Sequence, residues 1–203
     1  MYILKSLSEG LRILGFDKPT IKTVSREKDL EEIFLSTLFL NYLIVLIVYL
    51  FGILIGGYSI NGRELNMEVF FGLLMIYPFI YNLIIYIIYG FFGATAELMN
   101  SKKHIKPLIS VGFHTGIVYS ILILIICTIA SSIGFELGLI LLGIFALYFL
   151  YTMFISISTI YKFSLGQTLT VLMIPFLVLG ILLTIIGAIN PNFLTDIIVF
   201  FLA

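Results

Sequence analysis

Five long apolar runs dominate the chain, and each holds 25 residues or more without an Asp, Glu, Lys or Arg. They cover residues 33–62, 69–96, 107–135, 137–161 and 163–195. A helix needs about 20 residues to cross a hydrocarbon core of about 30 Å, so each run suffices for one membrane span and none comfortably holds two. We predict spans near residues 34–57, 70–95, 108–132, 138–160 and 167–189.

The apolar runs are continuous rather than alternating, which favours helices over a β-barrel, because backbone polar groups at bilayer depth must be satisfied within the segment or by a closed sheet. The composition agrees, with 61% hydrophobic and only 11% charged residues, against about 25% charged in a typical soluble domain. The predicted fold class is therefore all-α: a polytopic transmembrane helical bundle with five spans.

Basic residues mark one side of this bundle. The N-terminal segment holds six Lys and Arg, the second loop three and the fourth loop one, whereas the first loop holds only Arg63 and the third loop and C-terminus hold none. Because Lys and Arg accumulate on the cytoplasmic side, we predict a cytoplasmic N-terminus and a C-terminus outside.

Residues 1–32 are charged, unlike the membrane domain predicted for residues 33–203. Four leucines recur at helical spacing with charged residues between them, which predicts an amphipathic helix lying on the inner leaflet and ending near Gly15. The leucines are Leu4, Leu7, Leu11 and Leu14. Asp17, Lys18 and Pro19 then interrupt the pattern.

Polar residues inside spans usually face the bundle interior and are the default functional candidates. The candidates for intramembrane polar contacts are Asn41, Asn82, His114 and Gln167. Asn41 and His114 lie at similar depth, so a hydrogen bond between them is possible. His114 is interpreted as a packing residue, with proton handling as the alternative, and no carboxylate is expected at its depth.

Prolines and glycines indicate where helices bend or approach closely. Pro78 and Pro175 lie inside spans two and five, where each removes a backbone hydrogen bond and predicts a kink. Two small-residue pairs within spans match the close-packing motif of membrane helices. These pairs are Gly52 with Gly56, and Gly112 with Gly116.

The sequence shows no catalytic constellation: it has no paired metal-binding histidines, phosphate-binding glycine loop, serine elbow or cysteine pair. We therefore predict no enzyme, no cofactor and no metal site. The balanced net charge implies no nucleic-acid partner.

Several loose motifs together resemble the Yip family of Ypt/Rab-interacting five-span membrane proteins, in a short prokaryotic form. They are the glycine-containing end of span two (residues 89–97), the basic loop at 102–106, the opening of span three at 110–112, the polar turn at 161–167 and the proline at 175. The resemblance implies a five-span fold and a role in organising membranes. Eukaryotic members linked to Rab binding have longer N-terminal regions, so the 32 residues here argue against a Rab-type partner.

The predicted function is a non-enzymatic scaffold that organises membrane or partner proteins, placed in a prokaryotic cell membrane. Its expected partners are the lipid bilayer and other helices, as a homo- or hetero-oligomer. The alternative is a small transporter or channel that uses the buried polar residues.

Overall fold

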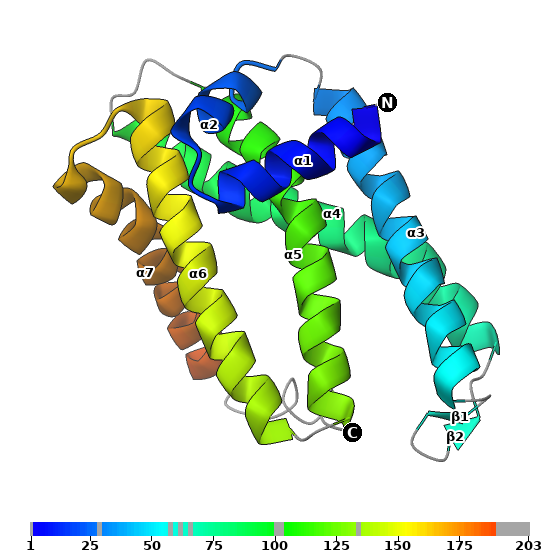
Figure 1. Ribbon diagram of the computed structural model, residues 1–203. Helices are drawn as coiled ribbons and strands as arrows, with labels where there is room; N and C mark the ends of the chain where they lie inside the picture. The colour runs from blue at the N-terminus through cyan, green and yellow to red at the C-terminus, as the bar shows by residue number, and fades with distance from the viewer. Residues whose placement is uncertain are drawn as a thin grey trace.

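A computed structural model describes residues 2–27, 30–56, 59–60, 63–64, 67–99, 104–132 and 135–189 of the chain. The described part is helical apart from one two-stranded hairpin (Figure 1). Two short helices come first, α1 (Tyr2–Leu14) and α2 (Lys18–Val24). The long helices are α3 (Leu30–Gly56), α4 (Met67–Leu98), α5 (Lys106–Ser132), α6 (Phe135–Tyr161) and α7 (Leu165–Ile189).

These five long helices are long and apolar enough to cross a membrane by length and composition. Four of them contain a predicted span in full, and α3 covers 34–56 of the predicted 34–57, so the all-helical class and the number of candidate spans are confirmed within the described residues. Helix bounds differ from the predicted ones by a few residues because polar turns at the ends of the spans continue the helix. The structure is thus compatible with a multi-pass integral membrane protein.

The helix α5 is the centre of the bundle. It contacts α1, α3, α4 and α6, and 72% of its candidate span is buried, compared with 17% for α3, 22% for α6 and 17% for α7. A stretch of ten consecutive buried residues, 111–120, covers every face of α5. This helix therefore carries the side chains that are most completely withdrawn from the surroundings.

A small hairpin, β1 (Ser59–Ile60) paired antiparallel with β2 (Arg63–Glu64), lies between α3 and α4. The hairpin was not predicted, because it lies in the short connection between two apolar runs, for which no strand was expected. The signal was present: the strands are separated by Asn61 and Gly62, a dipeptide that favours two-residue hairpin turns.

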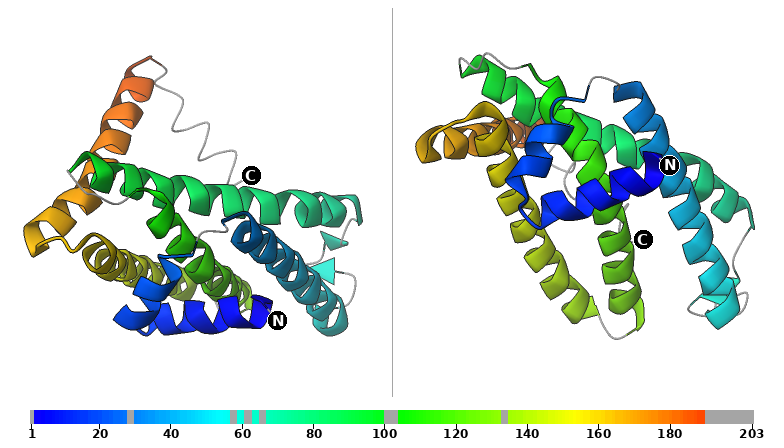
Figure 2. Two further views of the ribbon diagram at one scale, coloured as in Figure 1. Left: turned by 90° about the horizontal axis from the view of Figure 1, so that it is seen from above. Right: turned by 45° about the horizontal axis from the view of Figure 1, so that its top comes forward.

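The N-terminal segment crosses the bundle. In Figure 1, α1 passes in front of α5, from the side of α6 toward α3, and the views in Figure 2 show the same crossing. It contacts both α5 and α3, while α2 packs against α6 and α5. Gly10 permits the crossing, because a Cβ added there would lie only 2.2 Å from the backbone oxygen of His114.

The face that α1 turns toward α5 includes only part of the predicted leucine stripe, since Leu14 is buried with Val118 and Tyr119 of α5 and Leu7 packs against the same cluster. Ser6, Gly10 and Ile13 are buried, whereas Leu4 and Leu11 are 74% and 54% exposed. Small side chains let two helix backbones approach closely, and that geometry selects the buried face here. The helix ends close to Gly15, as the sequence indicated.

Phe16, rather than Gly15, takes the left-handed conformation that closes the helix, with φ of 62°. The amide nitrogens of Phe16 and Asp17 bond the oxygens of Ile13 and Arg12, which is the Schellman pattern. The Phe16 ring packs edge-on against Tyr151 of α6, with ring centroids 4.8 Å apart. This aromatic contact offsets the cost of a left-handed conformation in a residue with a bulky side chain.

Candidate functional site

His114 is the centre of the candidate site. It lies eight residues after the first residue of α5, about 12 Å along the helix axis at 1.5 Å per residue, and its side chain is fully buried. The ring Nδ1 lies 2.9 Å from the backbone oxygen of Ser110. A carbonyl oxygen only accepts hydrogen bonds, so Nδ1 carries a proton and donates it, which orients the other ring nitrogen, Nε2, away from the backbone of α5.

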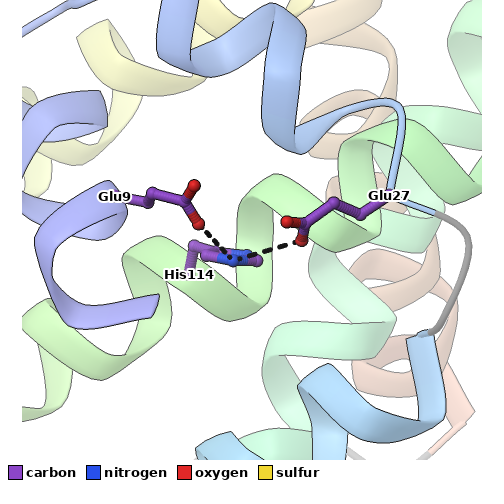
Figure 3. Close-up of side chains that lie close together, drawn as sticks. All are labelled: Glu9, Glu27 and His114. Carbon is purple, nitrogen blue, oxygen red and sulfur yellow. Dashed lines mark ion pairs between the residues drawn. The ribbon is translucent and has the colours of Figure 1, made fainter. Parts of the chain in front are cut away.

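Two carboxylates meet this second nitrogen (Figure 3). Glu9 of α1 places its Oε2 atom 3.3 Å from His114 Nε2, and Glu27, just after α2, places its Oε2 atom 3.4 Å from the same nitrogen. The expectation that no carboxylate lies at the depth of His114 is therefore wrong. That expectation took into account only the residues of the spans, whereas both carboxylates come from the N-terminal segment that folds over α5.

Lys5 completes the cluster from the aqueous side. Its Nζ atom lies 2.9 Å from Oε1 of Glu27 and 3.8 Å from Oε1 of Glu9. Each glutamate thus turns one oxygen toward Lys5 and the other toward His114. The hydrogen bond to Glu27 raises the pKa of Lys5 above its ordinary value of 10.5, and burial opposes that shift. The lysine is therefore a permanent positive charge beside the two carboxylates at neutral pH.

The chemistry of the site follows from the tautomer. With the proton on Nδ1, a neutral ring would direct the Nε2 lone pair at two anionic oxygens, which is repulsive. Nε2 has no hydrogen-bond partner among the described residues, although it lies within ion-pair distance of both carboxylates. Such a nitrogen is stabilised either by a second proton or by a cation placed between it and the carboxylates.

A backbone contact supports the same region. Ser110, whose carbonyl oxygen holds His114, donates its hydroxyl to the backbone oxygen of Val24, the last residue of α2, at 3.0 Å. The imidazole and the segment that carries Glu27 are thus tied to one turn of α5. The positions of the three groups are fixed by the crossing of α1, α2 and α5 and not by a local motif.

The two predicted asparagines are buried but separate from this cluster. Asn41 of α3 is fully buried, and neither its side-chain oxygen nor its nitrogen has a partner among the described residues. The hydrogen bond envisaged between Asn41 and His114 is not present. The side-chain nitrogen of Asn82 donates to the oxygen of Pro78 at 2.8 Å within α4, while its side-chain oxygen has no partner in the described part.

Gln167 lies in an exposed position at the beginning of α7 and is a helix cap. The backbone nitrogen of Ser164 donates to Oε1 of Gln167 at 3.0 Å, and the backbone nitrogen of Gln167 donates to the hydroxyl of Ser164 at 3.4 Å. This reciprocal pair is a capping box. Its signature, Ser164 followed three residues later by Gln167, was present in the sequence and was interpreted instead as a polar group kept in the membrane.

The second predicted glycine pair lies at the contact of α5 with α4. A Cβ added to Gly112 would lie 2.5 Å from the ring of Tyr89, and one added to Gly116 would lie 3.4 Å from the side chain of Ile85. The Tyr89 hydroxyl also shares a hydrogen bond of 2.9 Å with Thr115. The glycines thus allow a large aromatic ring to fit between two helices.

The remaining predicted packing and kink residues lie in α3, α4 and α7. Gly52 and Gly56 belong to α3, but their surroundings lie outside the described residues. The helices α4 and α7 continue through Pro78 and Pro175, so the predicted kinks stay predictions. Glu97, at the end of α4, lies 3.5 Å from Nδ1 of the exposed His104.

An apolar cavity of about 410 Å³ lies between α4, α5 and α6, and Phe176 of α7 also borders it. Other residues that line it are Ile85, Ile88, Tyr119, Ile123, Phe145 and Phe149. It exposes aliphatic and aromatic carbon rather than charged groups. The cavity is thus suited to hydrocarbon and is chemically unlike the cluster at His114.

Comparison of the chain with protein-family models, curated proteins and solved structures finds no match. The resemblance to the Yip family therefore stays a prediction that depends on the loose motifs alone. The chain is therefore a helical protein with five helices long and apolar enough to span a membrane, and in the part that the structure describes Glu9 and Glu27 meet the buried His114.

Proposed function

We propose that the chain is an integral membrane protein with five spans, its N-terminus in the cytoplasm and its C-terminus outside, in a prokaryotic cell membrane. Lys106 at the beginning of α5 and Lys162 just after α6 belong to the same end of the bundle as the first residues of α3. The basic segment that carries α1 and α2 lies at this end too (Figure 1). In the sequence, ten of the eleven basic residues fall in the N-terminal segment and in the second and fourth loops, and the positive-inside rule supports a cytoplasmic location for these segments.

Reporter fusions test this orientation. A reporter that is active only in the cytoplasm is fused after Ala203 in one strain and within the α5–α6 connection in another. A matched fusion after Lys162 provides the positive control. We expect activity from the control alone, and activity of the C-terminal fusion in the cytoplasm would contradict the topology.

The role that the geometry supports best is a non-enzymatic scaffold of Yip type, which organises membrane or partner proteins through lateral helix contacts. The observation that carries this proposal is the exposure of α7. Every residue from 176 to 185 is exposed, on all sides of the helix, and 17% of the candidate span is buried. In Figure 2 (left), the outer half of α7 extends beyond α4, away from α1.

An apolar helix that is exposed on all sides offers a long surface to lipid or to another helix. The packed part of α7 is its first half, where Val171, Leu172 and Pro175 are buried. Within the membrane, close packing between helices is the main source of association. We propose that the outer half of α7 forms such a contact with a second copy of the chain.

Cysteine scanning in native membranes tests the contact. In a Cys127→Ser background, single cysteines are placed at each position from 176 to 186, and disulfide-linked dimers are measured after mild oxidation. A specific helix contact gives a yield that rises and falls with a period of about 3.6 residues. A cysteine at the buried Val171 is the matched control and should not cross-link. Uniform yields or none along the scan would contradict the proposal.

A transporter or channel is the second candidate, because the buried His114 and the partly buried Glu9 and Glu27 form the kind of ionisable cluster that ion pathways use. The apolar lining of the cavity between α4, α5 and α6 favours the scaffold instead. Purified protein in liposomes separates the two. Proton or cation flux that is lost in His114→Gln but kept in His104→Gln would support transport and reject the scaffold.

A further inference from the structure

Three potential metal ligands converge at one point, although they lie far apart in the sequence. One oxygen of Glu9, one oxygen of Glu27 and Nε2 of His114 all lie within 4.8 Å of one another. They come from α1, from the segment after α2 and from α5. The imidazole is fully buried and the glutamate side chains are 14% and 17% exposed, so the site is enclosed on the protein side and reachable from the surface.

The distances from His114 Nε2 to the two glutamate oxygens fit a metal ion bound between them better than direct hydrogen bonds. A charge-assisted bond between a nitrogen and a carboxylate is about 2.7–2.9 Å long, whereas the two separations at Nε2 are 3.3 and 3.4 Å. A tetrahedral zinc ion with bonds of about 2.0–2.1 Å has ligand atoms about 3.3–3.4 Å apart, from the geometry of a tetrahedron. Rotation of the flexible glutamate side chains brings their two oxygens to the same spacing.

The surrounding contacts are those that metal-binding histidines use. A ligating imidazole usually donates its other N–H to a carbonyl or carboxylate, which fixes the tautomer and the ring orientation. His114 does this through the oxygen of Ser110 at 2.9 Å. Lys5 engages the Oε1 atom of each glutamate, so that the Oε2 atoms face Nε2. The buried Nε2 and the Oε2 atom of Glu9 have no hydrogen-bond partner among the described residues.

We propose that a divalent metal ion such as Zn²⁺ binds to Glu9, Glu27 and His114. One imidazole nitrogen with two carboxylate oxygens suits Zn²⁺, Mn²⁺ or Fe²⁺, whereas Mg²⁺ and Ca²⁺ prefer oxygen ligands alone. The ion offsets the two negative charges and uses the Nε2 lone pair. Three protein ligands leave a fourth position for water or for a further ligand.

The consequence is a metal-dependent attachment of the N-terminal segment to the membrane domain. The ion joins α1 and the segment after α2 to the central helix, and this attachment does not depend on the lateral contact proposed for α7. Removal of the ion should therefore loosen residues 2–27 while the five long helices stay folded.

Metal titration of the full-length protein tests the site. Protein purified in detergent is stripped with a chelator and titrated with Zn²⁺ by calorimetry, and with Co²⁺ as a visible-absorption reporter of tetrahedral coordination. We expect one ion per chain and a tetrahedral Co²⁺ spectrum. Wild-type protein that is folded by circular dichroism and binds no Zn²⁺ would overturn the proposal.

Variants identify the ligands. We expect His114→Gln and Glu9→Gln each to weaken Zn²⁺ binding by more than about 10-fold, since loss of a group that only supports a ligand already costs about 10- to 100-fold. His104→Gln and Glu31→Gln are the matched controls, because both residues are exposed, and binding to these variants should equal that of wild type. Equal weakening in controls and ligand variants would overturn the assignment.

Replacing His114 with another metal-binding residue tests the proposal if the His114→Gln variant does not fold. In a Cys127→Ser background, His114→Cys keeps a metal-binding side chain. Direct coordination through position 114 would add a thiolate-to-cobalt charge-transfer band to the Co²⁺ spectrum. A Co²⁺ spectrum without that band would show that position 114 does not bind the ion and would overturn the proposal.

Discussion

The crossing of α1 over α5 depends on Gly10, and Gly10→Ala is the most informative single substitution. The added Cβ would lie 2.2 Å from the backbone oxygen of His114 and 3.1 Å from its carbonyl carbon. Ordinary contact between a carbon and a carbonyl oxygen begins near about 3.3 Å, so the two helices must separate by about 1 Å. Neither atom belongs to a flexible side chain, and the strain therefore falls on the position of α1 itself.

Two free-energy contributions of opposite sign determine how much Gly10→Ala weakens the docking of α1. Alanine favours an isolated helix over glycine by about 1 kcal/mol, while overpacking of this kind costs about 1–3 kcal/mol. Because the clash is between backbones, we take the upper half of that range, which leaves a net cost of about 1–2 kcal/mol for docking α1. Each 1.4 kcal/mol is a factor of ten, so the population of undocked α1 should rise about 5- to 30-fold.

Hydrogen exchange measures this population directly. Amides of α1 should exchange about 5- to 30-fold faster in Gly10→Ala than in wild type, while amides at the centre of α5 stay protected. Gly15→Ala is the matched control in the same segment, because its Cβ would meet Arg12 at an ordinary 3.4 Å. Exchange of α1 in Gly10→Ala that equals wild type would refute the packing argument.

Four further substitutions test the remaining contacts. Gly112→Ala forces a Cβ to within 2.5 Å of an aromatic ring of α4 and should cost about 1–3 kcal/mol in thermal unfolding in detergent, whereas Gly116→Ala, at 3.4 Å, should change stability by much less. Gln167→Ala should speed exchange only in the first turn of α7, because a lost cap costs about 1 kcal/mol. A hydrogen bond from Thr20, followed by the influence of a nearby arginine, lowers the pKa of Asp17 below its ordinary 3.8. The stabilisation that the ionised Asp17 gives to the connection between α1 and α2 is present above pH 3.8 and is lost as the pH falls through the lowered pKa. Protease cleavage between α1 and α2 should therefore increase at that low pH. This pH dependence should be weaker in Thr20→Val.

The long apolar runs could be predicted to be helices because their conformation depends on their own residues and not on distant parts of the chain. A run such as residues 137–161 must be helical in lipid whatever its neighbours are, since no other open structure satisfies its backbone. The capping box at Ser164 and Gln167 is equally local, and it could have been identified from spacing alone. The hairpin around Asn61 and Gly62 belongs to the same group of readable signals.

The candidate site could not be predicted in this way. His114 was noticed because a titratable group inside a span is rare, but Glu9 and Glu27 look like ordinary charges of a solvated segment. Residues 9, 27 and 114 meet only because Gly10 allows α1 to cross α5, and because Ser110 ties the end of α2 to the same turn. The stripe of leucines coincides only in part with the buried face of α1, since the stripe reports which side chains are apolar and not how closely two backbones can approach.

The sequence by itself determined the helical class, the number of candidate spans and the asymmetry of charge, because bilayer thickness and backbone hydrogen bonding act on each segment separately. The tertiary structure decided which ionisable groups share a site. The electrostatic interaction among one imidazole, two carboxylates and a lysine depends on separations of a few ångströms, and those separations are set by how three distant segments pack around α5.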